Sequence, residues 1–313
     1  MATIKNSNQI EATSIGLALG GGGVKGLAHI ALLKHLDYLG VKPNVIAGTS
    51  MGAIVGALYA RGLSGIEIEE RVHAHIVSRK ETVKEVFKRR KHLLKWAKVF
   101  SYEKARGGLF NADGLFEHLF SEIVDVSFEE LTTPFTAVAT DYHLGTEVAL
   151  TEGPLLPAVR ASMAVPGVFA PVTLNKRLLV DGGLTNNVPC EYAAFHHLET
   201  NRRGSDIDVS EKNSDKKNAK GLISHLLIAS DVICLPAHPN PKSIQVMSGS
   251  VSIMLKAATR QKLALHPPQF LFSPLTEDID AFDFHKIRQV LERGEQAVNA
   301  SREALDKLLQ ASS

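Results

Sequence analysis

The chain has 313 residues, of which 44% are hydrophobic and 22% charged, so it has the composition of an ordinary globular protein with enough length for a large core. A formal net charge of only +2 indicates neither a nucleic-acid-binding protein nor an acidic tail. Residues 1–14 are polar without the apolar segment of a secretory signal, and no stretch is apolar for the length of a membrane span. Cys190 and Cys234 lie in no metal-ligand spacing and are expected to be free thiols, which favours a cytoplasmic protein.

The first elements of the chain predict the opening of a parallel α/β sheet. Residues 15–19 are typical of a short buried strand, four glycines at 20–23 end it, and 24–39 has the apolar spacing of a helix that Gly40 stops. Residues 45–47 predict the next strand, and apolar residues at helical density follow from Ala53. This order of strand, glycine loop, helix, strand and helix is that of a βαβ unit.

A strongly basic segment follows. Residues 66–106 have a helical pattern, and 79–106 contain 11 Lys and Arg against 3 Glu, a local net charge of +8, interleaved with aromatic residues. One interpretation is a solvated helix face on the body of the protein. The alternative is a basic, aromatic flap in transient contact with an anionic membrane surface, which would make the protein peripheral at the membrane.

The remainder of the chain completes an α/β domain. We predict further helices at 111–124, 157–163 and 282–309, and strands at 135–140, 147–150, 177–180 and 226–235. Residues 200–220 are polar and charged and are expected to form a mobile surface loop. The predicted fold is a three-layer α/β/α sandwich with a mainly parallel central sheet, in one domain over 15–310 that follows a flexible N-terminus at 1–14.

The segment Gly48-Thr49-Ser50-Met51-Gly52 matches the G-x-S-x-G pattern of a nucleophile elbow, in which a serine sits on a tight turn between a strand and a helix. Glycine is needed there because so sharp a turn crowds the backbone and because a substrate carbonyl must approach closely. The positive end of the following helix would face the reacting centre. The pattern by itself also occurs by chance in loops.

The glycine loop at 20–26 carries a second candidate site. Gly21, Gly23 and Gly26 satisfy G-x-G-x-x-G, so a dinucleotide site is one interpretation, but the second predicted strand ends in Gly48-Thr49-Ser50 rather than in an acidic residue. The Walker pattern fails because glycine follows Lys25. The remaining alternatives are an oxyanion hole made of backbone N–H groups and a purely structural tight turn.

A serine nucleophile needs a base. Asp181 ends an apolar predicted strand and precedes two glycines, a place where a carboxylate can reach the sheet edge, although Asp-Gly-Gly also suits an ordinary turn. Histidine is the base in α/β-hydrolases, and several follow Ser50 without standing at a distinctive turn: His143, His196, His197, His225, His238, His266 and His285.

Taken together, the blocks 21–26, 48–52 and 181–183 resemble, in order and spacing, the signature blocks of patatin-like phospholipases. Residues 161–171 and 181–189 also resemble the stretches around the aspartate in the bacterial branch, which is related to the catalytic domain of neuropathy target esterase. The match covers nearly the whole chain. One departure is Lys25, at a position where the family often has arginine, and the polar tract at 200–220 is longer than usual.

The resemblance implies a carboxylic ester hydrolase that acts on a lipid such as a phospholipid or lysophospholipid, with no metal or nucleotide required. It implies a Ser–Asp dyad in which Ser50 is the nucleophile and Asp181 the base. The oxyanion hole would be formed by the N–H groups of Gly21, Gly22 and Gly23. The supporting motif residues are Lys25, Gly26, Gly48, Gly52, Gly182 and Gly183. Three alternatives stay open: a histidine-dependent esterase, a nucleotide-binding module, and a non-catalytic lipid-binding regulator with a vestigial site.

Overall fold

The computed structural model describes residues 14–73, 121–194, 225–237, 239–241 and 243–310. Within these residues, eight strands form one sheet in the order β5-β6-β3-β2-β1-β7-β8, and β4 also pairs with β3. The strands are β1 (Ser14–Leu19), β2 (Val45–Thr49), β3 (Phe135–Asp141), β4 (Glu147–Leu150), β5 (Val172–Leu174), β6 (Arg177–Asp181), β7 (His225–Ser230) and β8 (Phe270–Phe272).

The centre of the sheet is parallel. Strands β3, β2, β1, β7 and β8 pair in parallel, and the antiparallel pairs all lie at the β3 side, where β4 and β6 pair with β3 and β5 pairs with β6. The predicted fold class, with its mainly parallel central sheet, is therefore confirmed. Because parallel strands end at a common edge, the segments that follow β1, β2 and β7 lie next to one another.

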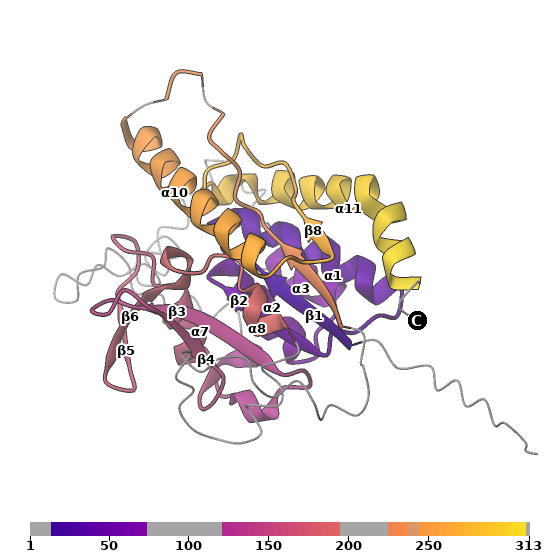
Figure 1. Ribbon diagram of the computed structural model, residues 1–313, viewed down its shortest axis with the longest axis horizontal. Coiled ribbons are helices and arrows are strands. Elements are labelled where there is room, and N and C mark those ends of the chain that lie inside the picture. The colour runs from indigo at the N-terminus through magenta and orange to yellow at the C-terminus, as the bar shows by residue number, and fades with distance from the viewer. Residues whose placement is uncertain (1–13, 74–120, 195–224, 238, 242, 311–313) are drawn as a thin grey trace, which may run out of the picture.

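Helices cover both faces of the sheet (Figure 1). The α-helices among the described residues are α1 (His29–Tyr38), α2 (Met51–Ala60), α3 (Gly65–Val72), α7 (Leu155–Ser162), α8 (Cys190–Ala193), α10 (Ser243–Leu265) and α11 (Ile287–Gln310). Five short 3-10 turns accompany them in this part of the chain: η1 (Gly23–Ala28), η3 (Ser121–Ile123), η4 (Phe128–Glu130), η5 (Gly182–Leu184) and η6 (Phe284–Lys286).

The two faces of the sheet differ in the size of their side chains. Leu17, Leu19 and Ile46 point into the main core, which is shared with α1, α2 and α11. Side chains alternate along a strand, so Ala18 and Ala47 point to the other face. There they meet α8 and Leu263 of α10, and such small residues allow α8 to lie close to the strands.

The two halves of α10 are held differently. Residues 243–255 contain no charged side chain and expose several apolar ones, including Met247 (62%) and Met254 (68%). The second half is anchored by Lys256, whose Nζ lies 2.7 Å from Oδ2 of Asp231, and by Lys262. Across the described ranges, no helix combines the length and apolarity that are needed to cross a bilayer.

Several predicted elements change their bounds. The helix expected at 24–39 begins with η1 and becomes α-helical at His29, the strand expected to reach residue 235 ends at Ser230, and the C-terminal helix starts at Ile287 after η6. Strands β5 and β8 and helix α10 were not predicted. The basic segment 79–106, the polar tract 200–220 and most of the helix predicted at 111–124 lie outside the described residues.

Candidate active site

Ser50 lies on a strained turn between β2 and α2. Its backbone has φ 55° and ψ −122°, which makes it one of three non-glycine residues with positive φ in the described part of the chain. This conformation costs on the order of 1–3 kcal/mol for a residue with a side chain, and such strain persists only where the surrounding structure enforces it. The residue is only 5% exposed.

Two glycines make the turn possible through close packing. A Cβ atom at Gly48 would lie 2.4 Å from the carbonyl oxygen of Gly52, and one at Gly52 would lie 2.2 Å from the carbonyl oxygen of Leu19. Both contacts are with backbone, which cannot move aside as a side chain can. The start of α2 is thus pressed directly against the ends of β1 and β2.

Ser162 fixes the backbone of the nucleophile candidate. The N–H of Ser50 donates to Oγ of Ser162 at 2.9 Å, and that hydroxyl donates in turn to the carbonyl oxygen of Val138 at 2.6 Å. Ser162 is fully buried at the end of α7. Sequence reasoning missed this residue, because no short motif reveals a partner 112 positions away.

The sheet register brings Asp181 to Ser50. Thr49 pairs with Val138 of β3, and Asp181, at the end of β6, pairs with the next residue of β3, Ala139. Ser50, the residue after Thr49, therefore lies level with Asp181 on the other side of β3, although β6 runs in the opposite direction to β2. The Ser50 hydroxyl is close enough to act as a hydrogen-bond donor that lowers the pKa of the aspartate.

The Asp181 carboxyl is almost completely buried, with 7% of the residue exposed. Burial raises its pKa to about 6, and the nearby Ser50 hydroxyl and the hydrogen bond from the Gly183 amide oppose this rise. The Gly183 N–H donates to Oδ1 at 2.7 Å. Oδ2 is buried and has no partner of standard hydrogen-bond geometry within the described chain, so the Ser50 hydroxyl is near the carboxyl without being aligned on it. This leaves Oδ2 available to accept a proton.

The glycines that follow Asp181 are required by the same packing. A Cβ atom at Gly182 would lie 2.0 Å from the carbonyl oxygen of Val138, and one at Gly183 would lie 2.9 Å from Oδ1 of Asp181. A side chain at Gly182 would collide with the backbone of β3, and one at Gly183 would crowd the carboxyl beside Ser50.

The glycine loop lies directly against the serine. A Cβ atom at Gly21 would be 3.0 Å from Cβ of Ser50, so this position brings the loop backbone within reach of the hydroxyl. The N–H of Gly21 donates to the carbonyl oxygen of Asn187 at 3.1 Å. The N–H groups of Gly22 and Gly23 have no hydrogen-bond partner among the described residues, which leaves these two free to bind an anion.

Lys25 and Gly26 anchor the loop to the body of the protein. Gly26 packs against Met51, since a Cβ there would lie 2.6 Å from that side chain. The Lys25 side chain is buried, and burial lowers the pKa of its amine against the opposing effect of nearby Cys234 and Asp280.

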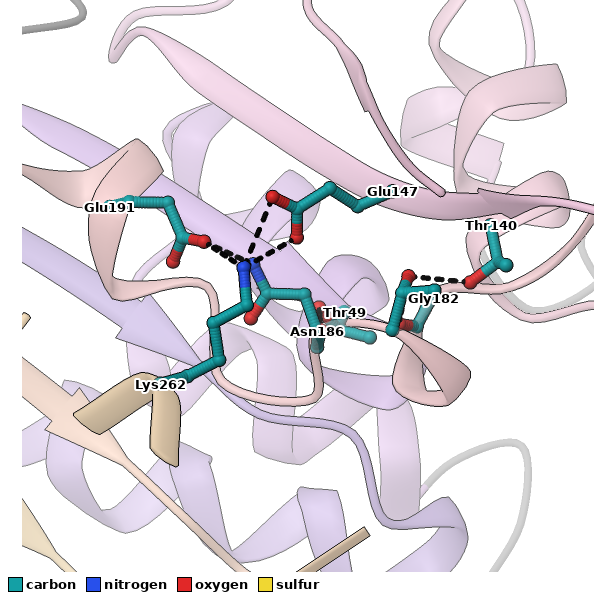
Figure 2. Close-up of polar contacts among 8 residues, drawn as sticks. Thr49, Thr140, Glu147, Gly182, Asn186, Glu191 and Lys262 are labelled. Carbon is teal, nitrogen blue, oxygen red and sulfur yellow. Dashed lines mark hydrogen bonds and ion pairs between the residues drawn. The ribbon is translucent and has the colours of Figure 1, made fainter. Parts of the chain in front are cut away.

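A polar network supports the residue before the serine (Figure 2). Oγ1 of Thr49 donates to the carbonyl oxygen of Asn186, whose side-chain amide donates to Oε1 of Glu191 at 2.8 Å. Lys262 of α10 lies between two carboxylates, 2.7 Å from Glu191 and 2.9 Å from Glu147. Neighbouring Asn187 is 96% buried and contacts the glycine loop through its backbone oxygen and its side chain. Neither asparagine was singled out from the sequence.

No histidine is among the groups that shift the Asp181 pKa in the described structure. His143 lies in the turn between β3 and β4, and His225 starts β7 at the opposite edge of the sheet from Ser50. His266 follows α10 and His285 lies in η6. His196, His197 and His238 lie outside the described residues.

These observations define an α/β protein with a serine on a strained strand-to-helix turn, a buried carboxyl beside it and a glycine loop over it. The family model for patatin-like phospholipases matches residues 17–194, more than half of the chain. The chain therefore belongs to the patatin-like phospholipase family, and the class of enzyme expected from the sequence is confirmed at that level.

Relatives in this family carry names linked to neuropathy target esterase. The chain is 34% identical over 175 residues to an uncharacterised NTE family protein of Mycobacterium tuberculosis, a match that covers 56% of this chain and 44% of the relative. It is 27% identical over 297 residues to the lysophospholipase NTE1 of Eremothecium gossypii, which covers 91% of this chain and 18% of that protein. The chain thus spans less than half the length of these relatives. Among solved structures, VipD of Legionella pneumophila aligns over 93% of this chain and 67% of its own at 11% identity, with a TM-score of 0.43.

Proposed function

We propose that the protein is a serine hydrolase that cleaves carboxylic ester bonds of lipids through a dyad of Ser50 and Asp181. The observation that carries the proposal is a hydroxyl on a strained turn beside a buried carboxyl whose pKa is raised to about 6. A carboxylate with this pKa is a stronger base toward serine than one near 4, and it is still mostly ionised at neutral pH. We further propose that residues 15–310 form one catalytic domain.

In the first half of the reaction, Asp181 takes the proton of the Ser50 hydroxyl through Oδ2 while Oγ attacks the ester carbonyl carbon. The negative charge moves to the carbonyl oxygen, where the free N–H groups of Gly22 and Gly23 and the positive end of α2 stabilise it. Of the three glycines expected in the oxyanion hole, Gly21 has its N–H engaged by Asn187 and contributes through its close approach to the serine.

Collapse of the tetrahedral intermediate completes the acyl transfer. The carbon–oxygen bond to the alcohol breaks, and the protonated Asp181 returns its proton to the leaving oxygen, which yields an acyl-serine. Water then attacks the acyl carbon while the Asp181 carboxylate takes its proton; the bond from the acyl carbon to Oγ of Ser50 breaks, Asp181 returns the proton to Oγ, and the fatty acid leaves. No step requires a group from outside the chain other than water.

The substrate class is proposed from the family and from one relative's name. A patatin-like phospholipase domain and a relative named lysophospholipase favour a phospholipid or lysophospholipid. Transient contact of the basic segment 79–106 with an anionic membrane surface remains a proposal on the sequence alone, as does a cytoplasmic location. Binding to anionic vesicles that weakens as salt is raised would support the contact, and equal binding to neutral vesicles would contradict it.

A hydrolysis screen tests the reaction. Lysophospholipid, diacyl phospholipid and a simple p-nitrophenyl ester are incubated with the wild type and with Ser50→Ala, and released acid or alcohol is measured. We expect hydrolysis of at least one lipid by the wild type alone, together with labelling of Ser50 by a fluorophosphonate. An intact fold without labelling would favour a non-catalytic lipid-binding protein instead.

A second set of variants separates the dyad from its rivals. If a histidine were the base, Asp181→Asn would leave hydrolysis intact, and an alanine substitution would abolish it at one of the candidates, which are His143, His196, His197, His225, His238, His266 and His285. Calorimetric titration with NAD(P) and ATP tests the nucleotide-binding alternative, and we expect no heat of binding.

A further inference from the structure

A fully buried histidine lies beneath the glycine loop. His29 is the first residue of α1 and has no exposed surface. Its Nε2 lies 2.8 Å from the carbonyl oxygen of Gly20, and its Nδ1 lies 2.7 Å from Oγ of Ser230, at the end of β7. The ring thus joins the residue that precedes the proposed oxyanion glycines to the neighbouring strand.

The chemistry of the two partners fixes the protonation of the ring. A carbonyl oxygen only accepts hydrogen bonds, so Nε2 of His29 carries the proton and donates to Gly20. Nδ1 is then the acceptor for the hydroxyl of Ser230. Burial lowers the pKa of His29 to about 4, so the ring keeps this neutral form at neutral pH.

The same hydrogen bonds fix the orientation of one peptide group. The carbonyl of Gly20 and the N–H of Gly21 belong to a single planar unit, whose oxygen is held by His29 and whose N–H is held by the carbonyl of Asn187. On the other side of Gly20, its own N–H donates to the carbonyl oxygen of Ser230 at 2.9 Å. The backbone is therefore fixed immediately before the free N–H groups of Gly22 and Gly23.

We propose that His29 is a positioning residue for the oxyanion hole, which acts by holding the Gly20–Gly21 peptide in the orientation that aims the following N–H groups at the reacting carbonyl. The inference rests on the proposed ester hydrolysis. It gives a role to a histidine upstream of Ser50, whereas the histidines considered from the sequence as bases all lie downstream. His29 does not touch the reacting atoms: its two ring nitrogens are both engaged.

Two amide substitutions separate the two hydrogen bonds. The amide nitrogen of glutamine reaches as far as Nε2, so His29→Gln retains a donor for Gly20. The shorter asparagine places its oxygen near Nδ1, so His29→Asn retains an acceptor for Ser230 and loses the bond to Gly20. His29→Leu removes both. A matched control is His35→Leu on the same helix, because His35 is also buried but its Nε2 contacts Asp306 of α11, away from the loop.

The measurements are kcat and KM on a soluble p-nitrophenyl ester, Ki for an alkyl trifluoromethyl ketone and the melting temperature. The ketone forms an adduct with serine whose oxygen occupies the oxyanion hole. We expect kcat to fall about 10²-fold in His29→Leu, about 10-fold in His29→Asn and only a few-fold in His29→Gln, with KM nearly constant. Ki should rise in the same order and by similar factors. His35→Leu should lower the melting temperature and leave kcat and Ki unchanged.

Two outcomes would overturn the inference. The first is a fall in kcat that only follows the fall in melting temperature, with the same kcat in His29→Gln and His29→Asn. The second is a fall in kcat while Ki for the ketone does not change. Failure of the proposed function is a separate result, because Ser50→Ala would then retain the activity of the wild type. If His29→Leu does not fold, the comparison of the glutamine and asparagine variants still decides.

Discussion

The two partners of the proposed dyad are prepared by opposite physical means. Ser50 is held by backbone: its positive φ is enforced by two glycines in van der Waals contact with carbonyl groups and by a hydrogen bond to Ser162. Asp181 has ordinary backbone, and what is unusual is its desolvated carboxyl with an unpaired Oδ2. The cost of the site is therefore conformational on the serine side and electrostatic on the aspartate side, and substitutions on the two sides should differ accordingly.

The largest expected effect is the loss of activity that both sides share. Ser50→Ala and Asp181→Asn should each lower kcat on the order of 10⁴-fold or more, because neither residue of a dyad works without the other. The double variant should be no worse than either single one. Additive losses, measured on the same ester substrate, would contradict a dyad that acts as one unit.

The next effect concerns Asp181, whose replacement should raise the stability of the protein and not lower it. In the unfolded chain the Asp181 pKa returns to about 3.8, so its rise to about 6 in the fold costs on the order of 3 kcal/mol above pH 6. The raised pKa of Asp181 stabilises the folded state most below pH 4, where the carboxyl is protonated. That stabilisation is lost as the pH rises through 6. Asp181→Asn should therefore raise the free energy of unfolding at pH 8, with a gain that nearly vanishes at pH 4. Urea titrations at the two pH values measure this.

The pH dependence of kcat should follow the ionisation of Asp181 alone. The base must be ionised, so log kcat should fall with a slope of one, tenfold per pH unit, below about pH 6 and be level above it. An acid limb near pH 4, the ordinary range of an exposed carboxylate, would contradict the desolvated environment of Asp181.

Ser162→Ala tests the conformational side. It leaves the N–H of Ser50 and the carbonyl oxygen of Val138 without their buried partner, which should cost about 1–3 kcal/mol of stability. Because the turn loosens, kcat should also fall, by roughly tenfold, with an unchanged pH midpoint. If the midpoint of the pH–rate profile shifted in this variant, the conformation of the Ser50 turn and the ionisation of Asp181 would not be independent.

The smallest effect measures the strain itself. Ser50→Gly and Ser50→Ala both lack the proposed nucleophile, but only glycine adopts positive φ without steric cost. The glycine variant should be more stable than the alanine variant by about 1 kcal/mol, in spite of the greater freedom of glycine in the unfolded chain. An alanine variant that is equally stable would show that the turn is not strained.

Much of the sheet and of the site's position follows from the sequence, because local patterns specify them. Each of these patterns is a short continuous stretch of sequence: the buried strands of the βαβ opening, the G-x-S-x-G turn and the strand that ends at Asp181. The order of the blocks indicates the family. Helix α10 was missed because its apolar residues are exposed and do not repeat at a helical period. Short strands such as β8 carry too few residues for a pattern.

The supporting residues of the site depend on contacts between distant segments. Ser162 holds Ser50 from 112 positions away, and His29 contacts Ser230 across 201 positions. A buried polar residue looks the same in the sequence whether it serves a catalytic loop or a core hydrogen bond. Only the sheet register, which places the ends of β1, β2, β7 and β6 together, distinguishes these roles.

The uneven anchoring of α10 has a consequence for how the molecule comes apart. Lys262 is shared by two carboxylates and Lys256 is paired with an almost completely buried one, so the C-terminal half of the helix cannot leave the sheet without stranding those charges. The first half has no such ties, and fraying of α10 should begin there and stop near residue 256. Asp231, Glu147 and Glu191 would then keep their lysine partners while the outer turns of the helix open and close.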